Sequence, residues 1–304
     1  MQLTSFFEAM FFAPKWYHYP LILLLLPLSM LYGIIMLLRR NLTKKKVYNI
    51  PIISIGNLIV GGSGKTPFTI ALAATLYDVT IISRGYGRKS RGLVEVSRKG
   101  EIVTTVEESG DEPMLMAHSL PNASVIVSED RDKAIHLAKE KGAKIIILDD
   151  GFNRVEIEKF EIILEPGRIK NYLPFPAGPF REFWFTKKYA DLVIKEERDF
   201  KRVVKVENPH PKMLLVTAIA NPQRLDPYLP TGVVQKVYLR DHEYFDEAEI
   251  KELMHRYGAD SLLCTSKDKV KMEGFDLPIS ELKLKLNIED DIIEKIQSYI
   301  QSGL

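Results

Sequence analysis

The stretch SIGNLIVGGSGKTPF, residues 54–68, limits what this chain can fold into more than any other part of the sequence. An apolar run typical of a buried strand, NIPIISIG, leads into it, and a helical pattern, PFTIALAATL, follows. The glycines between them let backbone N–H groups turn toward one anion, and the following helix adds the positive end of its dipole. A strand, a glycine-rich loop and Gly-Lys-Thr therefore predict a phosphate-binding loop.

The roles expected within this loop follow from the chemistry of a nucleoside triphosphate. Lys65 would reach the outer phosphates of ATP, and the Thr66 hydroxyl would hold Mg²⁺. The standard spacing would place a glycine where Ile59 stands, so that only VGGSGKT matches the pattern. The alternative is a flexible turn that binds nothing. The expected nucleotide-binding residues are Ile59, Val60, Gly61, Gly62, Ser63, Gly64, Lys65 and Thr66.

Two aspartates end another apolar strand, KIIILDD, at residues 144–150. Asp149 and Asp150 are therefore expected at the carboxyl edge of the sheet, where the phosphate loop also lies. A carboxylate at this edge can hold Mg²⁺ directly or through water, and we assign this role to Asp149. The alternative is an aspartate that caps a helix or a turn.

Strands and helices alternate along most of the chain, which predicts an α/β fold with mostly parallel sheets. Further buried strands are expected at 79–83 and 124–128, and a helix at 129–142. A proline-rich passage at 173–183 interrupts this order, and a second alternating set follows. We therefore expect a membrane-associated segment with its basic flank at 1–46, a nucleotide-binding domain at 47–165, and a second α/β domain at 166–304.

The N-terminal run at residues 19–38 contains no charged side chain. Twenty helical residues cover about 30 Å, which is the thickness of a bilayer's hydrocarbon layer. Aromatic residues precede the run and RRNLTKKK follows it, which favours membrane attachment with the following domain in the cytoplasm. Because Pro27 can kink the helix, both a full span and a helix lying in one leaflet stay open. A buried core helix is the third alternative.

The net charge and the cysteine content bear on nucleic-acid binding and on disulfide formation. The formal net charge of +2 gives no general attraction to nucleic acid, and we expect no nucleic-acid partner. The single cysteine, Cys264, cannot form an internal disulfide. Three polar positions are weak signals when each is taken alone. Asp111 could be a helix cap, Arg131 could lie on a solvated helix face, and His242 could be structural.

Taken together, the motifs resemble the tetraacyldisaccharide 4'-kinase family, the lipid A 4'-kinases of Gram-negative bacteria. The matching stretches occur in the family's order over most of the chain after residue 50: ISIGNLIVGGSGKTP, SRGYGRKS, ESGDEP, SEDR, ILDDGFNR, PAGPFRE, the pair DH at 241–242, and TSKD at 265–268. The resemblance implies two α/β/α domains, the first like a P-loop NTPase. It also implies transfer of the γ-phosphate of ATP to the 4'-hydroxyl of a tetraacylated glucosamine disaccharide 1-phosphate, forming lipid IVA.

The resemblance also implies roles for single residues. Asp111 matches the proposed catalytic base and His242 its supporting partner. Other active-site positions match Arg131, Asp149, Asp150, Arg181 and Glu182. ATP and Mg²⁺ would be required, and the substrate would be a membrane-embedded lipid met at the cytoplasmic face of the bacterial inner membrane. No obligate protein partner is expected. The chain departs from the family where Asn153 and Arg154 replace a usual Gln-His pair.

Two other kinds of protein share a phosphate loop. A GTPase usually recognises guanine through Asn/Thr-Lys-x-Asp, and TSKDK lacks that spacing. A membrane-anchored ATPase switch of the partitioning kind has a lysine at the start of its loop, where this chain has Val60. A membrane-anchored P-loop switch without lipid kinase activity is therefore the alternative to the kinase.

Overall fold

The computed structural model describes residues 2–61, 64–167 and 169–303. The chain divides into two compact units, each built from separated stretches. The first unit comprises Met1–Lys65, Ile145–Phe200 and Glu289–Leu304, and the second comprises Thr66–Lys144 and Lys201–Ile288. The boundaries expected near residues 47 and 166 describe continuous domains and stay a prediction.

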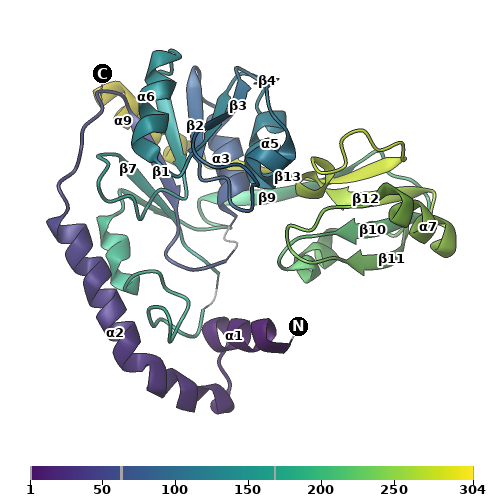
Figure 1. Cartoon of the computed structure of the whole chain (residues 1–304), viewed down its shortest axis with the longest axis horizontal. Coiled ribbons are helices and arrows are strands. Elements are labelled where there is room, and N and C mark those ends of the chain that lie inside the picture. The colour runs from purple at the N-terminus through teal and green to yellow at the C-terminus, as the bar shows by residue number, and fades with distance from the viewer. Residues whose placement is uncertain (1, 62–63, 168, 304) are drawn as a thin grey trace. The chain divides into compact units, whose positions relative to one another are not determined.

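The first unit contains the N-terminal helices and a set of parallel strands (Figure 1). Strand β1 lies between β6 and β7, and β8 pairs with β7, all in parallel. Its elements are α1 (Gln2–Phe12), η1 (Trp16–His18), α2 (Tyr19–Leu42), β1 (Ile52–Gly56), β6 (Ile145–Asp149), β7 (Phe160–Leu164), η2 (Trp184–Tyr189), β8 (Leu192–Ile194) and α9 (Asp290–Ser302).

The second unit contains two sets of strands, in the orders β4-β3-β5-β2 and β11-β10-β12-β13-β9. Strand β10 pairs in parallel with β11 and β12, β12 with β13, and β2 with β5, whereas β3 pairs antiparallel with β4 and β5. The part of the chain with the first set contains α3 (Lys65–Ala73), β2 (Val79–Ser83), β3 (Val94–Arg98), β4 (Glu101–Ile102), α4 (Val106–Ser109), α5 (Asp111–Ser119), β5 (Ser124–Val127) and α6 (Arg131–Glu140). The part with the second set contains β9 (Phe200–Glu207), β10 (Met213–Thr217), η3 (Pro222–Tyr228), β11 (Val233–Tyr238), α7 (Glu247–Tyr257), β12 (Ser261–Thr265), α8 (Ser266–Lys269) and β13 (Ile279–Ile288).

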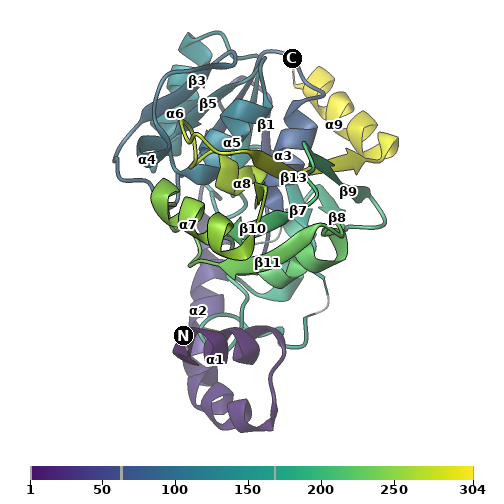
Figure 2. The same ribbon diagram turned by 90° about the vertical axis from the view of Figure 1, so that its right-hand side faces the viewer.

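Strands β1, β2, β6 and β10 are mostly apolar, and all of their residues are buried. All five residues of β1 are buried, which is expected of a central parallel strand. In β10 the two faces alternate: Leu214 and Val216 pack under α7, whereas Met213 and Leu215 pack with Leu282. Figure 2 shows α7 beside β10 and β11. The predicted α/β class with mostly parallel sheets and a preceding apolar helix is confirmed.

Helix ends follow local rules. The Asp130 carboxylate caps α6 by accepting a hydrogen bond from the Lys133 N–H at 3.2 Å, and Asp246 caps α7 in the same way. Helix α7 ends at Tyr257, and the following Gly258 has a φ of 61°, a left-handed conformation that suits glycine. Helix α2 carries arginines in its last turn, where cations complement the helix dipole.

One helical stretch among the described residues, Trp16–Leu42, is long and apolar enough to cross a membrane. Most of it is exposed. An apolar helix fit for membrane association is therefore present where the sequence predicted it. Length and composition alone do not distinguish a span from a helix in one leaflet.

Candidate active site

The phosphate loop connects β1, which ends at Gly56, to α3, which begins at Lys65. Its residues Gly62 and Ser63 lie outside the described residues. Gly61 and Gly64 have φ angles of 93° and 78°, a region that side chains with a Cβ rarely adopt. Thr66 is the second residue of α3. The loop therefore has the strand, left-handed glycines and helix start that a phosphate loop requires.

The first part of the loop is fastened to the proline-rich passage. The Val60 N–H donates to the Pro179 carbonyl at 2.9 Å, and the Arg181 N–H donates to the Leu58 carbonyl at 2.7 Å. Ile59 is buried in an apolar cluster that includes Phe180. Because the Val60 amide is engaged in this way, the amides from Gly61 onward are the candidates for phosphate.

Lys65 lies in a small charged group at the start of α3. Its Nζ is 3.3 Å from Asn57 Oδ1 and 3.5 Å from Asp150 Oδ1. Arg181 Nη1 donates to both Asp150 oxygens at 2.9 and 2.8 Å. Burial raises the pKa of Asp150, but the charges of Lys65 and Arg181 outweigh it, so its pKa lies below the usual value. This group, the phosphate-loop set, consists of Asn57, Lys65, Asp150 and Arg181.

Asp149 ends β6 and lies in register beside Ile55 of β1. It is buried. Among residues 2–61, 64–167 and 169–303, no three His, Cys, Asp or Glu side chains gather as a metal-binding group. Mg²⁺ in kinases is typically held by one or two carboxylates together with phosphate oxygens, and Asp149 and the Thr66 hydroxyl offer oxygen donors of that kind. The donor types present therefore fit Mg²⁺ bound with a nucleotide.

Glu182 pairs with the apolar helix α2 and not with the phosphate-loop set. Arg40 of α2 donates to its two oxygens at 2.7 and 2.9 Å. The two side chains are 7% and 5% exposed, so the ion pair is buried. The Arg40 guanidinium also lies 4.0 Å from the centre of the Phe152 ring and donates to the Phe152 carbonyl at 2.9 Å.

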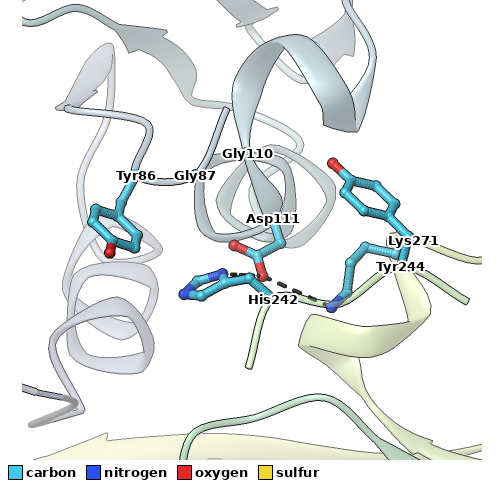
Figure 3. A pocket seen from close by; sticks show the side chains of 7 residues that line it. All are labelled: Tyr86, Gly87, Gly110, Asp111, His242, Tyr244 and Lys271. Carbon is cyan, nitrogen blue, oxygen red and sulfur yellow. Dashed lines mark hydrogen bonds and ion pairs between the residues drawn. The ribbon is translucent and has the colours of Figure 1, made fainter. Parts of the chain in front are cut away.

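A second group lies in the second unit around Asp111, the first residue of α5. His242 Nδ1 is 2.8 Å from Asp111 Oδ2. Lys267 Nζ lies 3.5 Å and Lys271 Nζ 3.9 Å from the same oxygen. In Figure 3, dashed lines join Asp111 to His242 and Lys271 in a pocket that Tyr86 and Tyr244 also line. We call Asp111, His242, Lys267 and Lys271 the Asp111 set.

Electrostatics in the Asp111 set favour an ionised carboxylate. Burial raises the pKa of Asp111, but the hydrogen bond with His242 and the charge of Lys267 outweigh it and lower the pKa below its usual value. The same hydrogen bond raises the pKa of His242. Burial lowers the pKa of Lys271, whose side chain is 1% exposed. A buried carboxylate that stays charged beside a histidine can accept a proton or orient a group that does.

Arg131 begins α6 and points back toward strand ends. Its Nη1 donates to the Ser83 carbonyl at 2.7 Å and to the Ser128 carbonyl. Both carbonyls stand at or just beyond the carboxyl ends of β2 and β5. The structure therefore places Arg131 at a strand edge, where ligands of α/β folds commonly bind.

The sequence alone did not single out four residues that contact the predicted ones. Lys267 lies in TSKD, one of the stretches that resemble the family, and Lys271 follows four residues later. Asn57 precedes the glycines of the phosphate loop, and Arg40 lies in the basic flank of α2. No local signal marks Arg40 or Lys271, because their partners lie more than a hundred residues away.

Comparisons with known proteins identify the family. A family model described as tetraacyldisaccharide-1-P 4'-kinase matches residues 21–212 and 198–301. The tetraacyldisaccharide 4'-kinase of Helicobacter pylori (strain HPAG1) is 48% identical over 299 residues, which cover 98% of this chain and 95% of that protein. The enzyme of the same name from Aliarcobacter butzleri (strain RM4018) is 42% identical, covering 97% and 96%.

A solved structure agrees with these relatives. The crystal structure of the "apo" form of LpxK from Aquifex aeolicus in complex with ATP superimposes with a TM-score of 0.77 at 30% identity, covering 93% of this chain and 99% of that one. The family predicted from the motifs is thereby confirmed. With a family model over nearly the whole chain and relatives at more than 40% identity, the chain belongs to the tetraacyldisaccharide 4'-kinase family.

Proposed function

We propose that this kinase transfers the γ-phosphate of ATP to the 4'-hydroxyl of a tetraacylated glucosamine disaccharide 1-phosphate, forming lipid IVA. The observation that carries the proposal is the contact of the buried Asp111 carboxylate with His242 at 2.8 Å. A phosphate loop alone would serve a switch as well as a kinase. A charged carboxylate in a pocket, held by a histidine and two lysines, supplies what transfer to a sugar hydroxyl needs.

In this proposal the phosphate-loop set binds the triphosphate of ATP. The Lys65 ammonium faces the outer phosphates, as the lysine of such loops does. Arg181 and Asn57 would adjust its position through their contacts with Asp150 and Lys65. The amides from Gly61 to Gly64 would donate to phosphate oxygens. Arg131 would add positive charge to the same reaction.

Mg²⁺ is part of the proposal because the donor types fit it. Thr66 and Asp149 would hold the ion, and Asp150 would stay with Lys65 and Arg181. The ion would neutralise charge on the phosphate oxygens while they are transferred.

Proton acceptance is assigned to the Asp111 set. The sugar hydroxyl gives up its proton as it attacks phosphorus, and the ionised Asp111 carboxylate would accept it. His242 would orient that carboxylate through its Nδ1. Lys267 and Lys271 would keep the carboxylate charged, because a positive charge within about 4–6 Å favours the ionised form. Glu182 would act in positioning, through its buried pair with Arg40.

The membrane contact and the location are also proposals. A four-chain lipid stays in its bilayer, so the enzyme would work at the surface of the membrane. The apolar α2 with the basic residues that follow it would attach the enzyme to the cytoplasmic face of the inner membrane.

The direct test is incubation of the purified protein with γ-labelled ATP and the disaccharide lipid, followed by localisation of the label on the product. We expect the label at the 4' position. An enzyme that hydrolyses ATP at the same rate with and without the lipid, and leaves the lipid unlabelled, would instead support the membrane-anchored switch.

A further inference from the structure

Helix α2 has two faces of different character. Ile22, Ser29 and Gly33 are buried along one stripe of the helix. On the other side Leu24, Leu31 and Leu38, spaced seven residues apart, are 75%, 55% and 51% exposed. A water-soluble protein rarely leaves so continuous an apolar face uncovered. The exposed face therefore has a partner of apolar chemistry.

The buried face contacts an irregular part of the chain, residues 171–183, which we call the docking segment. The Ser29 hydroxyl donates to the Pro174 carbonyl at 2.6 Å. Gly33 packs so closely on the Phe183 ring that an added Cβ would lie 2.7 Å from it. Near the end of the helix, Arg40 pairs with Glu182. The contacts thus extend from the middle of α2 to its last turn.

Both ends of α2 are also fastened to the same unit. Before the helix, the Phe12 carbonyl accepts a hydrogen bond from the Lys170 N–H at 3.2 Å, and the Phe12 ring packs on the cluster that contains Ile59. After the helix, Lys46 exchanges backbone hydrogen bonds with Glu156 and Glu158 at 2.8 and 3.0 Å. A helix that crosses a bilayer separates its ends by about 30 Å of hydrocarbon.

We propose that α2 lies in one leaflet of the membrane and does not cross it. If α2 crossed, the docking segment would lie in the hydrocarbon with it, although irregular backbone exposed to lipid is not tolerated there. The two ends of α2, which are both hydrogen-bonded to the same unit, would also have to lie at opposite surfaces of the bilayer. A helix in one leaflet keeps its buried face on the protein and gives only the leucine face to lipid.

The flanks of α2 fit an anionic bilayer surface. Trp16, Tyr17 and Tyr19 at its start are 82%, 45% and 51% exposed, and such aromatic rings favour the headgroup level. Exposed lysines follow its end at Lys44 and Lys45. Basic side chains of this kind are attracted to anionic lipids within a Debye length of the surface. Lipid of an anionic leaflet is therefore the partner of the exposed face.

Depth measurements would test this placement. Cys264 is fully buried and would first be replaced by alanine, leaving a chain without cysteine. A fluorophore on a single cysteine at position 24, 31 or 38 of the full-length protein would then be quenched by nitroxide lipids in vesicles containing phosphatidylglycerol. These positions are about 10 Å apart along the helix. A cooperative urea-unfolding transition like that of the parent protein would show that each variant is folded.

If α2 lies in one leaflet, the fluorophore at position 31 will not be the deepest of the three, because position 24 or position 38 will be at least as deep. In a crossing helix, position 31 is at the bilayer centre and will be deeper than both by about 10 Å, which would overturn the proposal. The set Leu28, Ile35 and Leu42, all exposed, repeats the measurement if the first set fails to fold.

Sidedness gives an independent test with a different readout. Lys15→Cys and Lys44→Cys flank α2 at exposed positions in the cysteine-free chain. A membrane-impermeant thiol reagent would be applied to intact spheroplasts and to inverted vesicles. We expect both cysteines to react from the same side. Reaction from opposite sides would show a crossing helix. Neither test uses catalysis as its readout, so failure here leaves the kinase proposal standing, and failure of label transfer leaves the topology standing.

Discussion

The buried ion pair between Arg40 and Glu182 allows a quantitative prediction. Their side chains are 7% and 5% exposed, and two hydrogen bonds at 2.7 and 2.9 Å join them. Arg40→Met leaves the Glu182 charge buried without its partner, which typically costs about 3–5 kcal/mol of folding free energy. Loss of the cation–π contact with Phe152 adds about 0.5–2 kcal/mol, part of which the methionine recovers by packing.

The neighbouring arginine provides a matched control. Arg39 pairs with Glu156 at 3.5 Å, and both side chains are more than 40% exposed. Exposed pairs contribute about 0–1 kcal/mol, so Arg39→Met should change stability little. The double variant Arg40→Met/Glu182→Met should be more stable than Arg40→Met alone, because no buried charge is left unpaired.

Urea unfolding in a fixed detergent would measure these differences. Tryptophan fluorescence is suitable because Trp184 lies two residues from Glu182, and Trp16→Phe leaves it as the single reporter. The midpoint and slope of each transition give the free energy of unfolding. If Arg40→Met proves no less stable than Arg39→Met, or if the double variant is less stable than Arg40→Met, the reasoning about the buried pair is wrong.

Four further predictions concern catalysis and pH. Asp111→Asn should reduce phosphate transfer by about 10²–10⁴-fold while ATP affinity, measured by equilibrium binding, stays close to wild type, whereas Lys65→Met should weaken ATP binding itself. Lys267→Met should reduce kcat, with Lys267→Arg retaining more activity because it keeps the charge beside Asp111; equal losses would exclude a charge effect. The hydrogen bond with Asp111 raises the pKa of His242. The extra stability of the wild type over His242→Gln should therefore be fully present below the ordinary pKa of 6.5 and should fade as pH rises through the raised native pKa. Urea unfolding at several pH values would measure this stability difference, and a difference that does not change with pH would contradict the prediction. Removal of divalent cations with EDTA should abolish transfer, and Mg²⁺ should restore it; transfer that continues in EDTA would contradict the assigned metal role.

The sequence predicts elements best where burial is complete. Strands β1, β2, β5 and β6 are short apolar runs, and each was expected within two or three residues of its observed bounds. The helices α3 and α6 were likewise expected from their sequence patterns. These elements are predictable because a parallel strand covered on both faces must be apolar along its whole length.

Two strands of mixed polarity, β9 and β13, were not predicted. Strand β13, with the sequence ISELKLKLNI, carries charged residues among its apolar ones, and no strand was expected there. Strand β9 has the same mixed character. Their identity as strands depends on neighbours such as β12, which contribute pairing partners from elsewhere in the chain. Pairing over such distances leaves no local pattern.

The candidate site was predictable only where its residues lie close together in the sequence. The phosphate loop is a local motif, and its strand and helix lie next to it in the sequence. The contact of Asp111 with His242 joins residues 131 positions apart, and only the resemblance to a family brought the two together. Lys271 and Arg40 carry no motif. Their relation to Asp111 and Glu182 is a property of the fold.

The docking segment connects two features of the first unit that the sequence presents as separate. Its Pro174 carbonyl and Glu182 carboxylate contact α2, while its Pro179 carbonyl holds Val60 of the phosphate loop. Its Arg181 side chain binds Asp150, beside Lys65. A shift in the position of α2 would therefore be transmitted to the phosphate loop through the docking segment. This arrangement fixes the phosphate loop relative to the helix proposed to contact lipid, because packed side chains and backbone hydrogen bonds leave little freedom between them.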